Sequence, residues 1–281
     1  SSLLKARRVI KNFSPDFAIG TGGFASGPAL VMASQMKNPI FIQEQNSLPG
    51  KTNIFLSKRA KAVFTAYPDM ERFFGKTTYF LGNPIRENII TEMIDTIPAK
   101  EKLGLDKDKL TILSVGGSLG SKVLNDAWER YAKEITDKGF QLIWQTGKGN
   151  LKPNEFQNTN IIKTEFLNDM PLVYSAADVI VSRAGAIAIS ELALAHKPIL
   201  LVPFPFAAED HQTKNALTLV NKNAAKMVKD SEMKDKFWTT LMEICENENL
   251  RKEMSKNLSY FAKPYATKEI VDKILEETRG E

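Results

Sequence analysis

Short apolar runs alternate with longer segments of helical periodicity along most of this chain, and no other feature limits its fold as strongly. The runs end in turn residues or charges, as buried parallel strands do. We expect strands at 16–21, 39–43, 62–65, 110–115, 141–145, 178–182 and 198–202, and helices at 26–36, 125–135, 170–176, 186–195 and 212–220. This alternation predicts an α/β fold with parallel sheets.

The chain has 281 residues, a length that favours two domains over one. The alternation stops in the polar stretch 92–103, which contains Pro98. The tail from Ser231 is helical in pattern and is interrupted by Pro264, so a last helix should begin near Thr267. We therefore expect a first domain at 1–91, a second at 92–266 and a terminal helix at 267–281. A ligand cleft should lie between the domains, beyond the carboxyl ends of the strands.

Composition excludes several classes of protein. Apolar residues make up 43% of the chain and charged residues 25%, which is ordinary for globular domains and unlike disordered or fibrous chains. The single Cys245 cannot form an internal disulfide, which favours a reducing compartment, and one cysteine with two histidines argues against a structural zinc site. No run approaches the roughly 18 to 20 apolar residues that cross a bilayer. We expect a protein that is soluble or at most peripheral to a membrane.

Basic residues gather near the start of the chain, although the net charge of +5 is mild and identifies no partner. They are Lys5, Arg7, Arg8 and Lys11, and the apolar residues interleaved with them at helical spacing are Leu3, Leu4, Val9, Ile10 and Phe13. Two interpretations stay open. The segment is either a basic amphipathic helix that lies on an anionic membrane or a packed helix with a solvated basic face.

Two glycine-rich loops follow expected strands, at 20–28 and 116–121. Glycines let backbone N–H groups approach a ligand closely, and the N-terminus of the following helix favours negative charge. The first loop could instead be a tight turn that lets strand and helix pack closely. The second reads G-G-S-x-G rather than G-x-G-x-x-G, and the next strand ends in Gln145 where a nicotinamide enzyme would place an acid. A dehydrogenase is therefore disfavoured, and a diphosphate held by Ser118 and the loop amides stays open.

Polar residues gather in two later strand-to-helix loops, at 182–191 and 203–216. Glu191 should lie about one and a half turns into a helix. Its carboxylate could accept hydrogen bonds from the two hydroxyls of a ribose, or it could be an ordinary solvated or helix-paired acid. In the other loop Asp210 could be an N-cap and His211 a base, a cap or a surface residue, with no Ser or Cys nucleophile motif nearby.

Six motifs occur in one order along the chain, at 20–28, 43–46, 82–86, 116–121, 182–191 and 203–216. In this order they resemble the MurG-type glycosyltransferases, and the resemblance extends from about Leu3 to the last helix. Those enzymes move N-acetylglucosamine from UDP-N-acetylglucosamine to the undecaprenyl-diphosphate-linked muramoyl-peptide of the bacterial cell wall. The resemblance implies an inverting transferase of peptidoglycan synthesis at the cytoplasmic face of the inner membrane. Its partners would be those two substrates and the membrane surface, with no nucleic acid.

The resemblance also implies an architecture. It is the GT-B fold, an α/β arrangement of two Rossmann-like parallel-sheet domains that face a cleft. Residues 1–91 would form the acceptor and membrane side, 92–266 would bind the UDP-sugar, and 267–281 would pack back on the first domain. No cofactor is implied, and the lack of an Asp-x-Asp motif fits catalysis without a metal.

Site residues follow from the matched motifs. Those implied to contact the UDP-sugar are Asn46, Arg86, Ser118, Leu167, Ala186, Ile187, Ala188, Ile189, Ser190, Glu191 and Gln212. In that set Glu191 would hold the ribose hydroxyls, the backbone of Leu167 would meet uracil, and Gln212 would contact the sugar. Arg86 and the helix N-termini would neutralise the departing diphosphate. The residues implied on the acceptor-diphosphate side are Thr21, Gly22, Gly23 and Ser26.

The sequence departs from the family pattern in three respects. Gln43 stands where the family usually has His, and His211 where it often has Gln. The family's first strand and glycine-rich loop, with a histidine proposed as general base, have no counterpart, so we expect the first part of a complete enzyme to be missing. The catalytic base stays unassigned, with Glu44 as the best carboxylate of the first domain. Two alternatives stay open: a nucleotide-sugar-binding fragment or subunit inactive without that loop, and a UDP-N-acetylglucosamine 2-epimerase.

Overall fold

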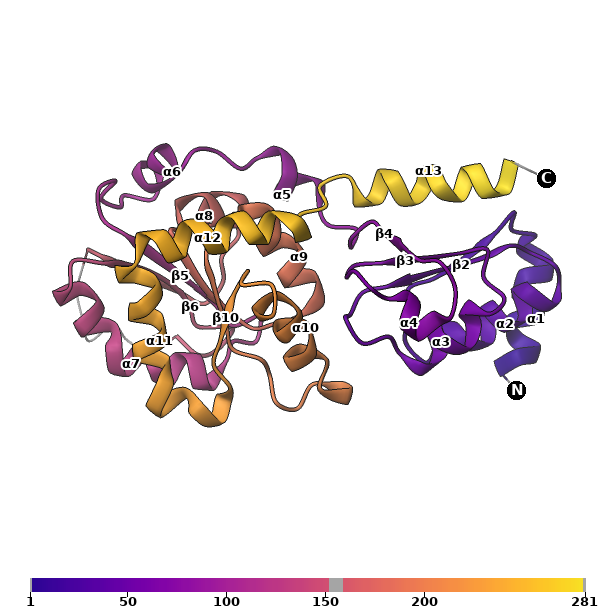
Figure 1. Cartoon of the computed structure of the whole chain (residues 1–281), viewed down its shortest axis with the longest axis horizontal. Helices are drawn as coiled ribbons and strands as arrows, with labels where there is room; N and C mark the ends of the chain where they lie inside the picture. The colour runs from indigo at the N-terminus through magenta and orange to yellow at the C-terminus, as the bar shows by residue number, and fades with distance from the viewer. Residues whose placement is uncertain (1, 152–158, 280–281) are drawn as a thin grey trace. The chain divides into compact units, whose positions relative to one another are not determined.

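The structure is a computed structural model that describes residues 2–151 and 159–279. The chain divides into two compact units, one formed by 1–85 with 263–281 and the other by 86–262. Each unit packs helices around a parallel sheet (Figure 1). The α/β class expected from the sequence is therefore confirmed.

The sheet of the first unit has four parallel strands in the order β1-β2-β3-β4. The strands are β1 (Ala18–Gly20), β2 (Ile40–Glu44), β3 (Ala62–Thr65) and β4 (Tyr79–Phe80). The helices of this unit are α1 (Ser2–Phe13), α2 (Ser26–Gln35), α3 (Lys51–Ser57), α4 (Glu71–Phe74) and α13 (Ala266–Arg279). Every strand-to-helix loop therefore leaves the same end of the sheet, where the carboxyl ends of the strands meet.

The last helix of the chain completes the core of the first unit. Ile270 and Ile274 of α13 are 4% exposed and pack with Phe41 and Phe64 of the sheet. The two phenylalanine rings are stacked, with centroids 6.2 Å apart. In Figure 1, α13 lies on one face of this sheet and α2 and α3 on the other. A segment from the far end of the sequence thus covers a sheet face that would otherwise expose aromatic rings to water.

The sheet of the second unit has six parallel strands in the order β10-β9-β8-β5-β6-β7. The strands are β5 (Thr111–Val115), β6 (Gln141–Gln145), β7 (Ile161–Thr164), β8 (Val179–Ser182), β9 (Ile199–Leu201) and β10 (Lys226–Met227). The chain adds β6 and β7 on one side of β5, then returns to add β8, β9 and β10 on the other side. This reversal leaves a crevice at the carboxyl ends of β5 and β8, the topological switch point at which open α/β sheets bind ligands.

Helices cover both faces of this second sheet. They are α5 (Glu87–Thr91), α6 (Thr96–Lys102), α7 (Lys122–Asp137), α8 (Met170–Ala176), α9 (Ala186–Ala195), α10 (His211–Val220), α11 (Met233–Glu246) and α12 (Glu248–Leu258). Trp128 of α7 anchors the core: it is fully buried, packs edge to face on Phe237, and donates a 2.6 Å hydrogen bond from Nε1 to Oγ of Ser114. The core therefore fixes α7 against β5, the strand that leads into the crevice.

Every strand expected from the sequence is present, β3 and β6 with the expected bounds. Three short strands, β4, β7 and β10, were not expected. The polar stretch 92–103 contains α6, whose Lys100 is 4% exposed and bonds Oδ2 of Asp178 at 2.6 Å. This ion pair, in which the lysine side chain is 5% exposed and the aspartate side chain 28%, joins α6 to the start of β8.

Candidate functional site

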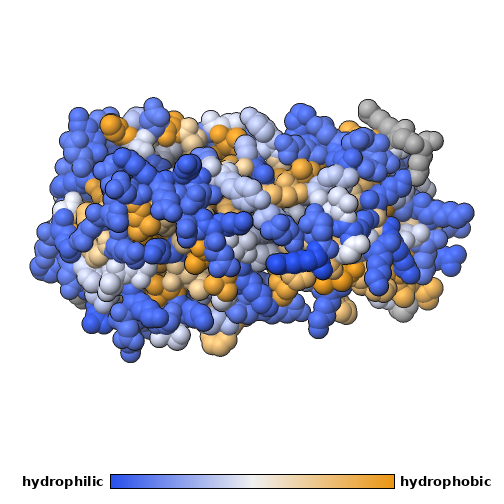
Figure 2. All heavy atoms as spheres, in the orientation of Figure 1, coloured by the Kyte–Doolittle hydropathy of each residue, from blue (hydrophilic) through white to orange (hydrophobic). Residues whose placement is uncertain are grey.

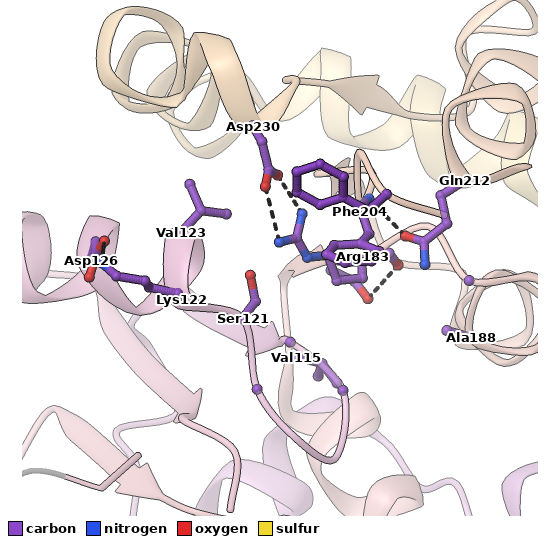
Figure 3. A pocket seen from close by; sticks show the side chains of 16 residues that line it. Val115, Ser121, Lys122, Val123, Asp126, Arg183, Ala188, Phe204, Gln212 and Asp230 are labelled. Atoms are coloured by element: carbon purple, nitrogen blue, oxygen red, sulfur yellow. Dashed lines mark hydrogen bonds and ion pairs between the residues drawn. The ribbon is translucent and has the colours of Figure 1, made fainter. Parts of the chain in front are cut away.

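A cavity of about 750 Å³ opens at the switch point of the second unit. Its walls come from the loops after β5, β8 and β9, and from Asp230 beyond β10 (Figure 3). Helices α7 and α9 both begin at these loops, with Lys122 and Gly185 among the lining residues. Because free N–H groups and the helix dipole make such ends partly positive, the crevice favours an anion such as a phosphate.

The loop between β5 and α7 keeps its backbone open to the cavity. Gly117 and Gly120 have φ values of 88° and 78°, a region that favours glycine. A Cβ atom on Gly116 would lie 2.8 Å from the backbone nitrogen of Ser121, so a side chain does not fit there either. Ser121 in turn caps α7, because its Oγ accepts a hydrogen bond from the backbone N–H of Leu124. The glycine-rich loop thus leads directly into a well-defined helix start.

A second glycine-rich turn, after β6, braces this loop, and the sequence interpretation missed it. Gly147 lies backbone to backbone against Gly120, and a Cβ atom on either residue would overlap the other loop. The N–H of Lys148 donates to the carbonyl of Ser118 at 3.1 Å, and Asn150 donates from Nδ2 to the carbonyl of Leu119 at 3.0 Å. The available signal was the sequence Gly-Lys-Gly-Asn at 147–150, which begins two positions after the end of an expected strand.

Arg183 ties the far wall of the cavity together. Its guanidinium donates to the carbonyls of Val202 and Pro203, each at 3.1 Å, and forms an ion pair with Asp230. It also lies 5.5 Å from the ring centroid of Phe204 (Figure 3). Because the guanidinium of Arg183 bonds protein groups of the loops after β9 and β10, it holds these two loops in place. Its cationic face supports the aromatic wall.

Gln212 has a fixed orientation at the cavity wall. Its Oε1 accepts hydrogen bonds from the backbone N–H groups of Ala184 at 3.1 Å and Phe204 at 3.0 Å. The side-chain oxygen is therefore committed to the protein, and the amide nitrogen is the end left to meet a ligand (Figure 3). Gln212 can offer hydrogen-bond donors to an acceptor such as a sugar hydroxyl or an acetamido carbonyl.

Glu191 is a buried carboxylate with two protein partners. The residue is 7% exposed, and its Oε1 accepts from Nη2 of Arg86 at 3.1 Å. Its Oε2 accepts from the hydroxyl of Tyr174 at 3.2 Å. Burial and the neighbouring charge of Glu191 raise the pKa of Tyr174, so the phenol stays protonated and acts as the donor. The interpretation of Glu191 as a solvated acid is therefore wrong. Its partners, Arg86 and Tyr174, lie outside α9, so it is not paired within its own helix either.

The expected UDP-sugar residues of the second unit fall into three groups. Ala188 and Gln212 line the 750 Å³ cavity, and Ser118 belongs to a lining loop without being a lining residue itself. Arg86 and Glu191 are paired with each other and are not among the lining residues. The remaining expected residues are Ala186, Ile187, Ile189 and Ser190 on α9, where the Oγ of Ser190 bonds the carbonyl of Ala186 at 3.1 Å, and Leu167, which is 8% exposed after β7. Their ligand contacts stay a prediction.

The expected acceptor-side residues follow β1 in the first unit. Gly22 and Gly23 have φ values of 92° and 76°, so glycine is the residue that suits this loop. Ser26 begins α2, and its Oγ donates to the carbonyl of Gly23 at 2.9 Å. No side-chain cap blocks the start of α2. The loop and Thr21 thus present a backbone suited to an anion, and their acceptor role stays a prediction.

Glu44 ends β2 as a structural carboxylate. It is 4% exposed and accepts hydrogen bonds from the backbone N–H of Asn46 at 3.0 Å, of Gly50 at 3.1 Å, and from Nδ2 of Asn53 at 2.7 Å. These bonds shape the loop that carries Asn46. Gln43, where the family usually has His, is 2% exposed and donates to Oδ1 of Asn83 at 2.7 Å. The role of Glu44 as a base stays a prediction that these contacts do not favour.

His211 begins α10 just after two residues with left-handed backbone. Glu209 and Asp210 have φ values of 50° and 55°. Asp210 occupies the N-cap position of α10, as one interpretation of the sequence had it, but its side chain makes no capping hydrogen bond. The Nδ1 atom of His211 is buried without a hydrogen-bond partner among the described residues, and its Nε2 lies 3.9 Å from Oε2 of Glu209. The loop therefore carries local backbone strain beside the cavity wall.

Comparison with protein-family models matches both units. Residues 1–65 match the glycosyltransferase family 28 N-terminal domain, and residues 111–270 match the glycosyltransferase family 28 C-terminal domain.

Curated relatives match nearly the whole chain. The UDP-N-acetylglucosamine–N-acetylmuramyl-(pentapeptide) pyrophosphoryl-undecaprenol N-acetylglucosamine transferase of Cytophaga hutchinsonii is 44% identical over 278 residues, which is 98% of this chain and 75% of the relative. The protein of the same name from Phocaeicola vulgatus is 46% identical over 268 residues, 93% of this chain and 71% of the relative.

Solved structures agree with this match. MurG of Acinetobacter baumannii aligns with a TM-score of 0.79 and 31% identity, covering 98% of this chain and 77% of the other. A UDP-N-acetylglucosamine 2-epimerase from Neisseria meningitidis aligns with a TM-score of 0.69 but only 15% identity, covering 98% of this chain and 79% of the other, which shows a shared fold alone. The expected GT-B fold class is confirmed.

Proposed function

The chain belongs to glycosyltransferase family 28 and, within it, to the MurG-type enzymes, and on that premise we propose that it transfers N-acetylglucosamine from UDP-N-acetylglucosamine to undecaprenyl-diphosphate-linked muramoyl-peptide. The product is the disaccharide-linked precursor of peptidoglycan. Residues 92–266 bind the UDP-sugar in this proposal, and residues 1–91 receive the acceptor.

The observation that carries the proposal is the crevice at the ends of β5 and β8. Two helices, α7 and α9, begin at its walls, and Gly116, Gly117 and Gly120 of the loop after β5 line it. A diphosphate is the ligand class that such a crevice suits, because several N–H groups converge on one negative group. Gln212 adds a donor for the sugar at this crevice, and Glu191, which is not among the lining residues, adds an acceptor for the ribose.

The reaction is a single displacement with inversion. The muramoyl hydroxyl attacks the anomeric carbon, a new glycosidic bond forms, and the bond from that carbon to UDP breaks. The hydroxyl proton passes to a base that we leave unassigned, since the carboxylate of Glu44 already accepts three hydrogen bonds that hold its own loop. Helix N-termini at the crevice and the guanidinium of Arg86 stabilise the charge on the departing diphosphate.

The lipid-linked acceptor places the enzyme at the cytoplasmic surface of the membrane in this proposal. Within residues 2–151 and 159–279, no helix is long and apolar enough to cross a bilayer. Helix α1 is the contact we assign. Every basic side chain on it is exposed, and Leu4, Val9 and Phe13 are 67%, 64% and 78% exposed. Figure 2 shows apolar beside hydrophilic side chains at the end of the first unit, where Figure 1 places α1 and α2.

Calorimetric titration and a transfer assay test the proposal together. UDP and UDP-N-acetylglucosamine should bind, whereas ADP, as a base-mismatched control, should not. With the lipid-linked muramoyl-peptide present, labelled N-acetylglucosamine should move to the lipid fraction. Conversion of UDP-N-acetylglucosamine to its 2-epimer without acceptor would instead support the epimerase alternative, and binding without any turnover would support a nucleotide-sugar-binding subunit.

A further inference from the structure

The partners of Glu191 leave a defined number of acceptor sites. An ionised carboxylate offers about four lone-pair sites, two on each oxygen. Arg86 occupies one site on Oε1 and Tyr174 one site on Oε2. Among residues 2–151 and 159–279, nothing further bonds the carboxylate, so one site on each oxygen stays open, and two neighbouring hydroxyls are groups that fill such a pair.

Tyr174 is held more firmly than Arg86. The tyrosine is 2% exposed, whereas the side chain of Arg86 is 61% exposed. Tyr174 lies on α8, whose start is fixed by Asp169, the Oδ1 of which accepts from the N–H of Leu172 at 3.0 Å. A buried ring on a capped helix can present its hydroxyl in one direction only, so the tyrosine is the partner that can define where the carboxylate points.

We propose that Tyr174 is a positioning residue for nucleotide recognition, whose hydroxyl fixes the carboxylate of Glu191 so that its two open sites accept the 2′- and 3′-hydroxyls of a ribonucleoside diphosphate. The inference rests on the proposed function and adds to it a source of sugar selectivity. Arg86, which is mostly solvated, stabilises the charge of the carboxylate but does not set its direction. Tyr174 touches no substrate atom itself and acts through Glu191.

The test compares UDP with 2′-deoxy-UDP and 3′-deoxy-UDP by calorimetry on the whole chain. The wild-type protein should prefer UDP to each deoxy ligand by roughly 10- to 100-fold, the range for a hydrogen bond to a charged group. In Tyr174→Phe, which keeps the ring and removes the hydroxyl, that preference should fall by about three- to tenfold. Each deoxy ligand keeps one of the two hydroxyls, so its binding should weaken less than that of UDP. A role in packing alone would weaken all three ligands in parallel and leave the preference intact.

Two variants complete the design. Tyr67→Phe is a matched control, because Tyr67 is also 2% exposed but lies in the first unit and its hydroxyl has no hydrogen-bond partner among the described residues. It should preserve the preference for UDP. In a Glu191→Gln background, Tyr174→Phe should cause no further change in preference, and this comparison holds even where the single variant is less stable.

The outcomes separate the two ideas. Wild-type protein that binds no UDP overturns the proposed function. Wild-type protein that binds UDP with the ribose preference, combined with an unchanged preference in Tyr174→Phe, overturns the role of Tyr174 alone. Equal binding of UDP and the deoxy ligands by the wild type also overturns the role of Tyr174, because Glu191 would then accept no hydrogen bond from the ribose hydroxyls.

Discussion

Arg86 and Glu191 are 105 positions apart in the sequence and form an ion pair with 3.1 Å between Nη2 and Oε1. The pair is asymmetric: 61% of the arginine side chain is exposed, against 9% of the glutamate side chain. A solvated guanidinium loses little when it changes partner, whereas a buried carboxylate needs compensation. In the function that we propose, Arg86 would turn toward the bound diphosphate while Tyr174 and the ribose hydroxyls satisfy Glu191.

Replacing the glutamate tests its ribose role. Glu191→Ala should weaken UDP binding by about 1 to 3 kcal/mol, the usual range when one partner of a buried polar contact is removed. The substitution also leaves the hydroxyl of Tyr174 without its acceptor, so unfolding should be measured beside calorimetry. Unchanged UDP affinity in a folded variant would remove Glu191 from the site.

Replacing the arginine tests the chemical step. Arg86→Ala should slow transfer by roughly ten- to a hundredfold, because a cation that stabilises the departing diphosphate acts most strongly in the transition state. Steady-state kinetics should show the loss mainly in kcat. Arg130→Ala, an exposed arginine on α7, serves as the control and should turn over normally. Normal turnover in Arg86→Ala would show that Arg86 does not stabilise the departing diphosphate.

Vesicle binding tests the membrane contact of α1. Each basic side chain near an anionic surface contributes about 1 kcal/mol, an effect that salt screens. Neutralising Arg8 and Lys11 to Ser should reduce cosedimentation with vesicles that contain anionic phospholipid, and binding to the wild type should fall as salt rises. Neutralising Lys133 and Lys138, exposed lysines of the second unit, should have no effect. Equal binding to neutral and anionic vesicles would contradict an electrostatic role for α1.

The sequence predicts best those elements whose pattern is local. Strands β3 and β6 and helices α8 and α9 have the expected bounds, because a buried strand is apolar throughout and a helix is periodic. Strands β4 and β10 are two residues each, and β7 is mostly half-buried at the edge of its sheet. Such short or half-exposed runs carry no clear pattern, and only pairing with a neighbouring strand defines them.

The sequence could not predict which side chains of the site would contact residues from distant segments of the chain. Glu191 was expected from its motif, but its burial and its bond to Tyr174 depend on how α8 packs against α9. Tyr174 itself belongs to no motif, and in the sequence it is only one aromatic residue within an expected helix. Likewise, Gly147 belongs to a turn after β6, and its importance comes from Gly120 on another loop. Contacts of this kind appear only once the strand order is known.

The contact between Gly120 and Gly147 leads to a prediction with an internal control. Gly147 and Gly149 share the left-handed backbone, with φ values of 88° and 75°, but a Cβ atom on Gly147 would overlap Gly120 whereas one on Gly149 would meet nothing within 4 Å. Gly149→Ala should therefore cost about 1 kcal/mol of backbone strain, and Gly147→Ala roughly 3 kcal/mol or more, because the loops must also separate. Denaturant unfolding measures both. Since the displaced loop carries Ser118, Gly147→Ala should weaken UDP binding as well. Equal unfolding free energies for the two variants would show that the loops part without cost.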